Sequence, residues 1–473
     1  MLTTAPRPGA LLPEPVSGAF PLMIFDPADG TAVGEVAGVG ADAAARAAAA
    51  AGAAFPGWAA RTAAERAAAL RAIAAGLREA AAELAALTTR ETGKRLEESH
   101  AEVGFSAGFF EWFAEAALAA EAGAEEAPTA PGRAFRVRRV PLGVVAAITP
   151  WNFPLSIPAR KVAAALAAGC TAVLKPSELT PLSAARMVEI CQRHLPPGTL
   201  TMVTGDPIGL TAALTGDPHV AAVSFTGSTR VGRIVAGQCA ERFLPAVLEL
   251  GGRGPFVVGA GADVDEAVEA LMVAKFRNNG ASCIAANNVF VHRSHYDTFL
   301  ERFTERVAGL RVGDPRDGST DLGPVISAAE RDRLAGLTAA AEARGARMWN
   351  GPRPPAEGCY VRPAVVECLA DDPLWSDEIF GPVAAVRPFT DADALVQEIN
   401  GWGYGLGGYV CDMPERARAL AGRLRIGIVG VNNGAPNNPR VPFGGFGDSG
   451  QGREGGMPGL LEFTTYQTIS EPA

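Results

Sequence analysis

The segment from Pro141 to Leu250 most constrains the fold, because short apolar runs alternate there with stretches of helical spacing. The apolar runs GVVAAIT, TAVLK, TLTMV and VAAVSF have the length and composition of buried strands. Such alternation predicts a parallel sheet covered by helices. Helical spacing also dominates residues 41–122, and a second alternating run extends from Gly254 to Phe443. The sequence therefore predicts an α/β protein, and its 473 residues suggest two or three domains.

Charge and cysteine usage narrow the function. The net charge of -9 argues against a nucleic-acid or anionic-membrane surface. Met1 to Phe20 lacks the pattern of a signal peptide, and no apolar run approaches the roughly 20 residues that span a bilayer. The seven cysteines are scattered without C-x-x-C spacing, which disfavours structural zinc and a disulfide framework. We expect a reduced cytoplasmic protein without a metal.

Cys283 is the candidate nucleophile. Gly280, Ala281 and Ser282 before it are small and leave its sulfur open to a substrate. A thiol of pKa about 8.5 is already a few per cent thiolate at neutral pH. The alternative is an inert buried cysteine, the commoner fate of an isolated thiol.

Four other features have chemistry that fits a catalytic site. Glu249 ends an apolar strand before two glycines and suits a general base, and Asn152 in PWNFP suits an oxyanion donor. Lys175 ends the strand TAVLK, where α/β sheets bind ligands. The glycine-rich FTGSTRVG opens a helix whose amides suit a pyrophosphate. Taken singly, each has a plainer alternative: a solvated strand-end acid, a turn asparagine, a surface lysine and a glycine turn.

Together these segments resemble the aldehyde dehydrogenase superfamily, nearest its succinate-semialdehyde dehydrogenase-like branch. The resemblance covers essentially the whole chain. It rests on motifs in the family's order and spacing: PWNFP at 150–154, LKPSELTP at 174–181, SFTGSTRVG at 224–232, LELGG at 248–252, NNGASCIAAN at 278–287, EIFGPV at 378–383, and PFGG followed by SGQGRE at 442–454.

The resemblance implies a three-part fold. A Rossmann-like dinucleotide-binding domain comprises residues 1–120 and 144–250, and an α/β catalytic domain comprises 251–444. Residues 121–143 and 445–473 form a small β oligomerisation ribbon and tail. A ribbon edge in need of a partner predicts a homodimer or homotetramer.

The resemblance also implies roles for matching positions. Cys283 attacks the aldehyde, Asn152 and the Cys283 backbone N–H hold the oxyanion, and Glu249 activates the deacylating water. Glu454 helps to relay the proton outward. The expected cofactor is NAD in preference to NADP, because a carboxylate at Glu178 repels a 2′-phosphate. The cofactor residues implied are Ile148, Thr149, Trp151, Lys175, Ser177, Glu178, Gly205, Gly209, Phe225, Thr226, Gly227, Ser228, Val231, Leu250, Gly251, Glu378 and Phe380.

For the substrate, the sequence predicts an aldehyde with a second anionic group. Arg160 stands where relatives acting on apolar aldehydes place an aromatic residue, and an arginine fork suits a carboxylate or phosphonate. The alternative is that Arg160 pairs with a neighbouring acid. The predicted substrate residues are Arg160, Phe153, Ser282, Ile284, Asn437, Arg440 and Phe443.

Three positions depart from the family pattern. Ala281 replaces the usual Gln, Arg253 the usual Lys or Asn, and Asn288 the usual Arg. The arginine at that last position is associated in the succinate-semialdehyde branch with the distal carboxylate, so its loss weakens the prediction of that substrate.

Two other functions were weighed. A CoA-acylating dehydrogenase of the same fold usually lacks the base that Glu249 supplies. A non-enzymatic scaffold protein would lack Cys283 or Asn152, and both are present.

Overall fold

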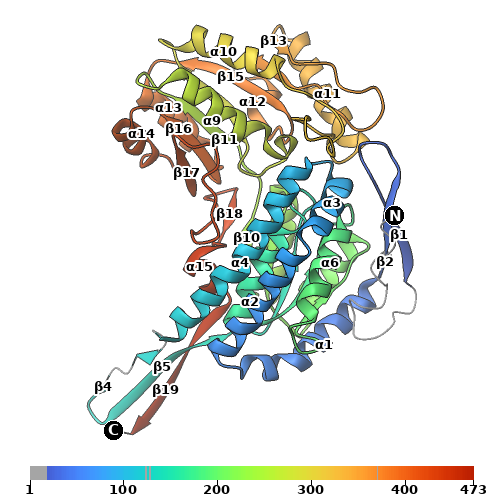
Figure 1. The fold of residues 1–473 in the computed structure, drawn as a ribbon. Coiled ribbons are helices and arrows are strands. Elements are labelled where there is room, and N and C mark those ends of the chain that lie inside the picture. The colour runs from blue at the N-terminus through green and yellow to red at the C-terminus, as the bar shows by residue number, and fades with distance from the viewer. Residues whose placement is uncertain (1–18, 123–124, 127–128, 370, 473) are drawn as a thin grey trace.

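A computed structural model describes residues 19–122, 125–126, 129–369 and 371–472. Two lobes, each built on a sheet, lie one above the other, and a ribbon projects from the lower lobe (Figure 1). The α/β fold expected from the alternation is confirmed.

The lower lobe contains a six-stranded sheet in the order β18-β10-β9-β6-β7-β8. Its strands are parallel except for β18, which pairs antiparallel with β10. The predicted apolar runs form its centre, and β6 and β7 are buried along their whole length. The strands are β6 (Val144–Ile148), β7 (Thr171–Lys175), β8 (Leu200–Met202), β9 (Val220–Thr226), β10 (Ala246–Glu249) and β18 (Gly450–Gln451).

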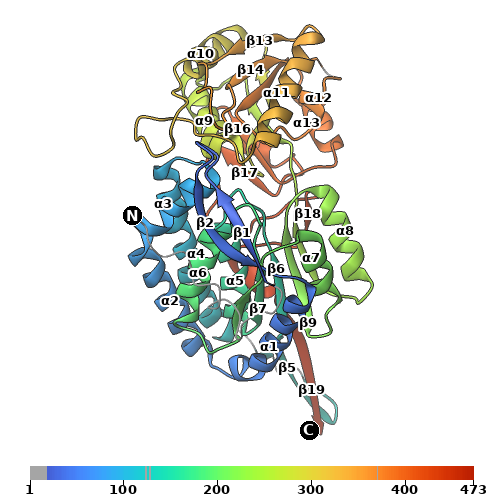
Figure 2. The same cartoon turned by 90° about the vertical axis from the view of Figure 1, so that its right-hand side faces the viewer.

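Helices cover both faces of this sheet (Figure 2). One face packs against α1 (Ala41–Ala59), α7 (Pro207–Gly216) and α8 (Thr229–Ala240). The other packs against α2 (Ala63–Glu79), α3 (Ala81–Thr92), α4 (Leu96–Ala122), α5 (Ser156–Ala168) and α6 (Pro181–Gln192). Local sequence fixes the helix starts: Thr62 and Glu65 form a capping box at α2, and Ser228 caps α8.

The upper lobe contains a seven-stranded sheet in the order β13-β14-β15-β12-β11-β16-β17. It is parallel except for the edge strand β13. The strands are β11 (Gly254–Val258), β12 (Ala286–His292), β13 (Arg347–Asn350), β14 (Ala364–Glu367), β15 (Val383–Phe389), β16 (Gly407–Cys411) and β17 (Ile428–Val431). One face packs on α9 (Val264–Phe276) and α10 (Tyr296–Ala308), and the other on α11 (Ala328–Ala343), α12 (Pro373–Ser376), α13 (Ala392–Gly401) and α14 (Pro414–Ala421).

The ribbon pairs two segments that are far apart in sequence. β5 (Arg133–Pro141) is antiparallel to β19 (Thr464–Pro472), with β3 (Glu125–Glu126) and β4 (Thr129–Ala130) on its other side. Of the predicted ribbon and tail segment, residues 445–473, β19 is the part that pairs within the ribbon. β18 joins the six-stranded sheet, and α15 (Gly456–Leu461) packs on α4 and α5. The hairpin β1 (Phe20–Phe25) and β2 (Ala32–Gly38) completes the fold.

Two searches of the described residues bear on membranes and metals. No helix among them has both the length and the apolarity to cross a bilayer. They also contain no group of three or more His, Cys, Asp or Glu side chains arranged to hold a metal ion.

Candidate active site

The carboxyl ends of the parallel strands in the lower lobe bring the predicted motifs to one edge. Thr149 follows β6, Lys175 ends β7, Thr226 ends β9 and Glu249 ends β10. The strand order reverses between β6 and β9, since β7 and β8 continue to one side and β10 to the other. Open α/β sheets bind ligands outside such a switch point.

A cavity opens at this edge, which we name the strand-end cavity. It combines strand-end residues of the lower lobe with residues of the upper lobe. Its lining is Pro150, Trp151, Asn152, Thr226, Gly227, Ser228, Glu249, Leu250, Gly251, Cys283, Glu330, Arg333, Glu378 and Phe380. Glu330 and Arg333 were missed by the sequence analysis, because α11 meets the sheet edge only in the folded chain.

The loop that carries Glu378 and Phe380 is held in a strained conformation. Phe380 has a φ of 53°, which is unfavourable for a bulky residue. The preceding Ile379 is fixed on both sides, because its N–H donates to Asn287 and its carbonyl accepts from Arg333. The Trp151 ring meets the Phe380 ring edge-on at 5.5 Å. The strain therefore places an aromatic wall against Trp151.

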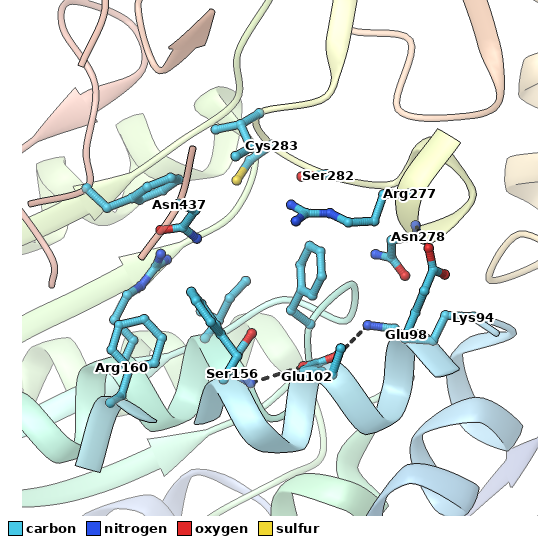
Figure 3. A pocket seen from close by; sticks show the side chains of 17 residues that line it. Lys94, Glu98, Glu102, Ser156, Arg160, Arg277, Asn278, Ser282, Cys283 and Asn437 are labelled. Atoms are coloured by element: carbon cyan, nitrogen blue, oxygen red, sulfur yellow. Dashed lines mark hydrogen bonds and ion pairs between the residues drawn. The ribbon is translucent and has the colours of Figure 1, made fainter. Parts of the chain in front are cut away.

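A second cavity, the helix-side cavity, lies beyond Cys283 between α4 and α5 of the lower lobe and the loop that precedes β12 (Figure 3). Its lining is Lys94, Glu98, Ala101, Glu102, Phe105, Phe109, Phe153, Ser156, Ile157, Arg160, Arg277, Asn278, Ser282, Cys283, Ile284, Asn437 and Phe443. Cys283 lines both cavities. It thus stands where two ligands, one from each cavity, would meet.

The asparagines before Cys283 shape its loop. Asn278 and Asn279 both adopt positive φ, at 54° and 55°, a conformation that asparagine tolerates better than most residues. The Asn278 side chain donates to the carbonyls of Asn152 and Ala281, at 2.9 and 2.8 Å. A side chain at Gly280 would lie 2.2 Å from the Gly381 carbonyl oxygen. The motif NNG is therefore needed for the turn that presents the thiol.

The surroundings of Cys283 favour its neutral thiol form. Burial raises its pKa well above the usual range, and the neighbouring Glu249 carboxylate raises it further. The sequence analysis assigned an ordinary thiol pKa, which these surroundings contradict. The other cysteines of the chain lie outside both cavities. A nucleophilic role for Cys283 would therefore require a neighbouring group that accepts its proton.

Glu249 is the group beside Cys283 that can accept a proton. Its side chain is 1% exposed, and burial raises its pKa while Arg160 opposes that rise. The Cys283 thiol is the side-chain hydrogen-bonding neighbour of this carboxylate, and neither oxygen meets a conventional nitrogen or oxygen donor within the described structure. A buried carboxylate of raised pKa with free oxygens has the properties of a general base.

A charged network extends from Glu249 into the lower lobe. Arg160 lies 3.6 Å from Glu249 and 2.6 Å from Glu454. Lys161 pairs with Glu454 and donates to Ser224 at 3.0 Å. The basic neighbours hold the pKa of Glu454 below its usual value despite its burial. Arg160 is therefore paired with acids, the alternative considered from sequence, although it also lines the helix-side cavity.

Asn152 faces Cys283 from the strand-end side. Its amide nitrogen donates to the Ala281 carbonyl at 3.1 Å, and its main-chain carbonyl accepts from Lys94 at 2.9 Å. Glu102, paired with Lys94, accepts from the N–H groups of Leu155 and Ser156, each at 3.0 Å. The loop that carries Asn152 is thus held rigidly, with one amide hydrogen left for a ligand.

Arg277 is the unexpected residue of the helix-side cavity. In Figure 3 its guanidinium points into the space between Cys283 and α4. Across the part of the chain that the structure describes, Arg277 has no ion pair, whereas Lys94 pairs with Glu102, Arg160 with Glu454, and Glu98 with Arg95. The helix-side cavity therefore has one uncompensated positive charge. The signal in the sequence was an arginine six residues before the candidate nucleophile.

Of the other predicted substrate residues, five line the helix-side cavity and one lies on the outer surface. Phe153, Ser282, Ile284, Asn437 and Phe443 line the helix-side cavity. The prediction for Arg440 requires correction: its side chain is 58% exposed, pairs with Glu115 at 2.8 Å and lies over the Trp112 ring. The acid on α4 draws it to the outer surface.

Position 288 also differs from expectation. Asn288 is fully buried in β12 and donates to the Trp375 carbonyl at 2.7 Å. The Asn288 side chain faces the interior of the upper lobe and does not line the helix-side cavity. Its departure from the family pattern therefore removes no contact to a substrate.

The remaining predicted cofactor residues extend the strand-end edge. Ile148, Phe225, Val231 and Leu250 belong to the apolar cluster at the sheet, and the Lys175 ammonium lies 3.6 Å from Glu178. Gly205 touches Val39, where a side chain would lie 2.4 Å from the carbonyl oxygen. Gly209 donates to the N-cap Asp206 of α7. Thr149 and Ser177 are buried at the same edge.

This arrangement fits a nicotinamide dinucleotide. The Thr226 hydroxyl is buried and has no hydrogen-bond partner in the described structure, and Ser228 leads into α8, whose first amides face the strand ends. At Gly251 a side chain would lie 2.7 Å from a Glu378 oxygen, so glycine keeps the cavity open. Trp151 and Phe380, in edge-on contact with each other, provide an aromatic wall of the cavity.

The chain was compared with known proteins. Residues 17–469 match the family model described as "Aldehyde dehydrogenase family". The chain is 39% identical to a 3-sulfolactaldehyde dehydrogenase of Pseudomonas putida over 94% of this chain and 92% of that protein. It is 38% identical to an NADP-dependent succinate-semialdehyde dehydrogenase of Escherichia coli over 93% and 92%. Among solved structures, a succinate-semialdehyde dehydrogenase from Burkholderia pseudomallei superposes with a TM-score of 0.93, at 38% identity over 96% and 95% of the two chains.

Proposed function

Because the chain belongs to the aldehyde dehydrogenase family, we propose that it oxidises an anionic semialdehyde to the carboxylate through a thioester on Cys283. Its NAD(P)-dependent aldehyde dehydrogenase activity follows from the family. The identity of the aldehyde and the role of each residue are the proposal. One observation carries it: Cys283 lines both cavities, and the helix-side cavity has an unpaired arginine.

The unpaired Arg277 supports an anionic substrate. A charge held in a largely apolar cavity without a partner is costly unless a ligand compensates it. The planar guanidinium suits a carboxylate or a sulfonate. The names of the two relatives agree, since succinate semialdehyde bears a carboxylate and 3-sulfolactaldehyde a sulfonate. With its anion on Arg277, a short semialdehyde directs its other end toward Cys283.

The protein residues act in the following order. Glu249 accepts the Cys283 proton as the sulfur adds to the aldehyde carbon. The free amide hydrogen of Asn152 and the Cys283 backbone N–H hold the resulting oxyanion. Glu249 releases the Cys283 proton to water before hydrolysis. After oxidation it takes a second proton from the water that attacks the thioester, and the carboxylate product leaves. Glu454 is the nearby carboxylate that would help to relay these protons outward, and Arg160 and Lys161 hold it in place.

The cofactor would occupy the strand-end cavity. When bound, the nicotinamide supplies the acceptor for the hydride of the thiohemiacetal. Trp151 and Phe380 would flank its ring, Glu378 would accept from its ribose, and Ser228 with the first amides of α8 would face the pyrophosphate. Lys175 and Glu178 would contact the adenosine ribose, and the Glu178 carboxylate favours NAD over NADP by repelling a 2′-phosphate.

The test is NADH appearance with purified protein and a panel of aldehydes, with and without CoA. Succinate, glutarate and sulfonate-bearing aldehydes should give a kcat/KM at least about tenfold above uncharged aldehydes of equal length, since one charge-assisted contact contributes about 1.5–3 kcal/mol. Turnover should not need CoA, because Glu249 is present to activate water. A preference for uncharged aldehydes, or a strict need for CoA, would overturn the proposal.

We also propose a homo-oligomer. β19 is an edge strand of the ribbon, and its Tyr466 and Ile469 are exposed apolar side chains. An exposed edge of this kind favours pairing with a second copy. Light scattering on the eluting protein should give a mass of two or four chains, and a monomer at micromolar concentration would contradict this assignment.

A further inference from the structure

The short segment before Glu378 is held by two side chains from other elements. The Trp375 carbonyl accepts from the Arg253 guanidinium at 2.5 Å and from the Asn288 amide at 2.7 Å. Arg253 precedes β11, and Asn288 lies within β12, so both donors come from the centre of the upper-lobe sheet. Two strong donors on one buried carbonyl fix the position of the peptide that carries it.

The Trp375 side chain is fixed as well, by a chain of ring contacts that leads back to Arg253. The Arg253 guanidinium lies over the Trp402 ring at 4.2 Å. Trp402 stacks with Phe290 at 5.8 Å, and Phe290 meets Trp375 edge-on at 5.0 Å. The guanidinium therefore binds Trp375 directly through the carbonyl and indirectly through the rings.

These contacts converge on Glu378 from both ends of the segment. Gly252, the residue before Arg253, donates its N–H to the Glu378 carboxylate at 3.3 Å. Asn287, the residue before Asn288, donates to the Asp377 carbonyl and accepts from the Ile379 N–H, at 3.0 and 2.8 Å. Gly252 and Arg253 thus hold the Glu378 carboxylate and the Trp375 carbonyl. Asn287 and Asn288 hold the backbone on both sides of Glu378.

We propose that Arg253 is a positioning residue that, with Asn288, holds Glu378 in place for the nicotinamide ribose. The inference rests on the proposed function, because it takes Glu378 as a cofactor contact. Two of the three positions at which the chain departs from the family pattern are then explained together, since they share one acceptor. Asn288 has a role in the cofactor site and none toward the distal end of the substrate.

The experiment measures the binding of NADH and of ADP, which lacks the nicotinamide ribose, to the full-length protein. Arg253→Met keeps an apolar side chain over Trp402 but removes the donors to the Trp375 carbonyl. NADH should bind about tenfold more weakly, while the Kd for ADP should change less than about twofold. A general loss of structure would weaken both ligands alike, and such a result would overturn the inference.

Glu378→Gln provides the reference. It should weaken NADH and spare ADP in the same way, and the double variant should bind NADH no more weakly than the poorer single variant. If Glu378→Gln behaves as described but Arg253→Met binds NADH normally, this inference fails alone. If Glu378→Gln also binds NADH normally, the proposed cofactor contact fails with it. Additive losses would show that Arg253 acts elsewhere.

Arg253→Lys keeps the experiment decisive if the methionine variant does not fold. The ammonium retains a positive charge and donor hydrogens but loses the planar fork. Its loss of NADH affinity should be smaller than that of Glu378→Gln, with ADP again unaffected. Normal NADH binding by Arg253→Lys together with a lowered Tm would instead assign Arg253 a structural role only, and the inference would be wrong.

Discussion

The two cavities that meet at Cys283 are built in different ways. The polar residues that the strand-end cavity takes from the lower lobe lie at the carboxyl ends of strands or in the short loops that follow them, as Glu249 and Asn152 do. The helix-side cavity is assembled from α4, α5, the loop before β12 and the segment around Asn437. Strand ends are placed by the sheet itself, whereas helix faces and loops are placed by packing.

The difference extends to charge. In the strand-end cavity the buried Glu249 and the half-buried Glu378 have raised pKa values, that of Glu378 at about 7, whereas Glu330 and Arg333 form an ion pair with each other. In the helix-side cavity the charged groups Lys94, Glu98, Glu102 and Arg160 all have ion-pair partners within the protein, and Arg277 has none in the described structure. We infer that the first cavity serves chemistry common to the family, and that the second sets which aldehyde is used. The predictions below test that division in order of expected effect.

The largest effect should come from Cys283, which both cavities share. Cys283→Ala removes the nucleophile, so turnover should fall by about 10³-fold or more, while NADH still binds because its contacts lie on the strand-end side. Steady-state rates and NADH fluorescence titration measure the two. A variant that keeps a tenth of wild-type turnover would show that the nucleophile has been misassigned.

Glu249→Gln should uncouple the two halves of the reaction. Loss of a general base typically costs about 10²–10⁴-fold, and here the loss should fall mainly on thioester hydrolysis. The expected trace is a burst of about one NADH per site followed by very slow turnover. No burst would mean that Glu249 is also required to deprotonate Cys283, and an unchanged steady-state rate would exclude it.

The pH profile should have an acid limb set by Glu249. Burial raises its pKa, and the base must be deprotonated, so kcat should fall about tenfold per pH unit as pH decreases through that raised value. The limb should therefore lie above the range of an ordinary glutamate. Glu249→Gln should lose it. A limb that persists in the variant belongs to another group.

Substitution of Arg277 tests the helix-side cavity, and the same substitution at the surface residue Arg440 is its control. Arg277→Met should raise KM for a semialdehyde about tenfold or more and leave an uncharged aldehyde of equal length unaffected. Arg440→Met removes an equal charge from the outer surface and should change neither KM. Equal effects of Arg277→Met on both aldehydes would indicate damage to the cavity instead of loss of an anion contact.

The smallest effect concerns Glu178, which lies outside the strand-end cavity, three residues after the carboxyl end of β7. Glu178→Gln should raise kcat/KM for NADP by about three- to tenfold, because it removes a repulsion and frees the Lys175 ammonium 3.6 Å away. The value for NAD should change less. A wild-type enzyme that already prefers NADP would contradict the proposed role of Glu178.

The sequence by itself determined the family and the α/β fold, and it predicted the residues of the chemical centre. Strands and their carboxyl ends are local features, so an apolar run that stops at Lys175 or Glu249 already locates a residue at the sheet edge. The NNG turn before Cys283 is local in the same sense, since it depends on residue types that tolerate positive φ.

Only the tertiary structure decided which charges remain available. From sequence, Arg160 and Arg440 were the candidate anion contacts, yet Glu454 and Glu115 compensate them, and Arg277 is left unpaired. Glu454 follows Arg160 by 294 residues, as the numbering shows. Pairing between charged groups depends on distances of a few ångströms between elements that are remote in sequence. The local sequence pattern therefore predicts the element on which a charged side chain lies. Packing decides whether that side chain pairs with another protein residue or remains available to a ligand.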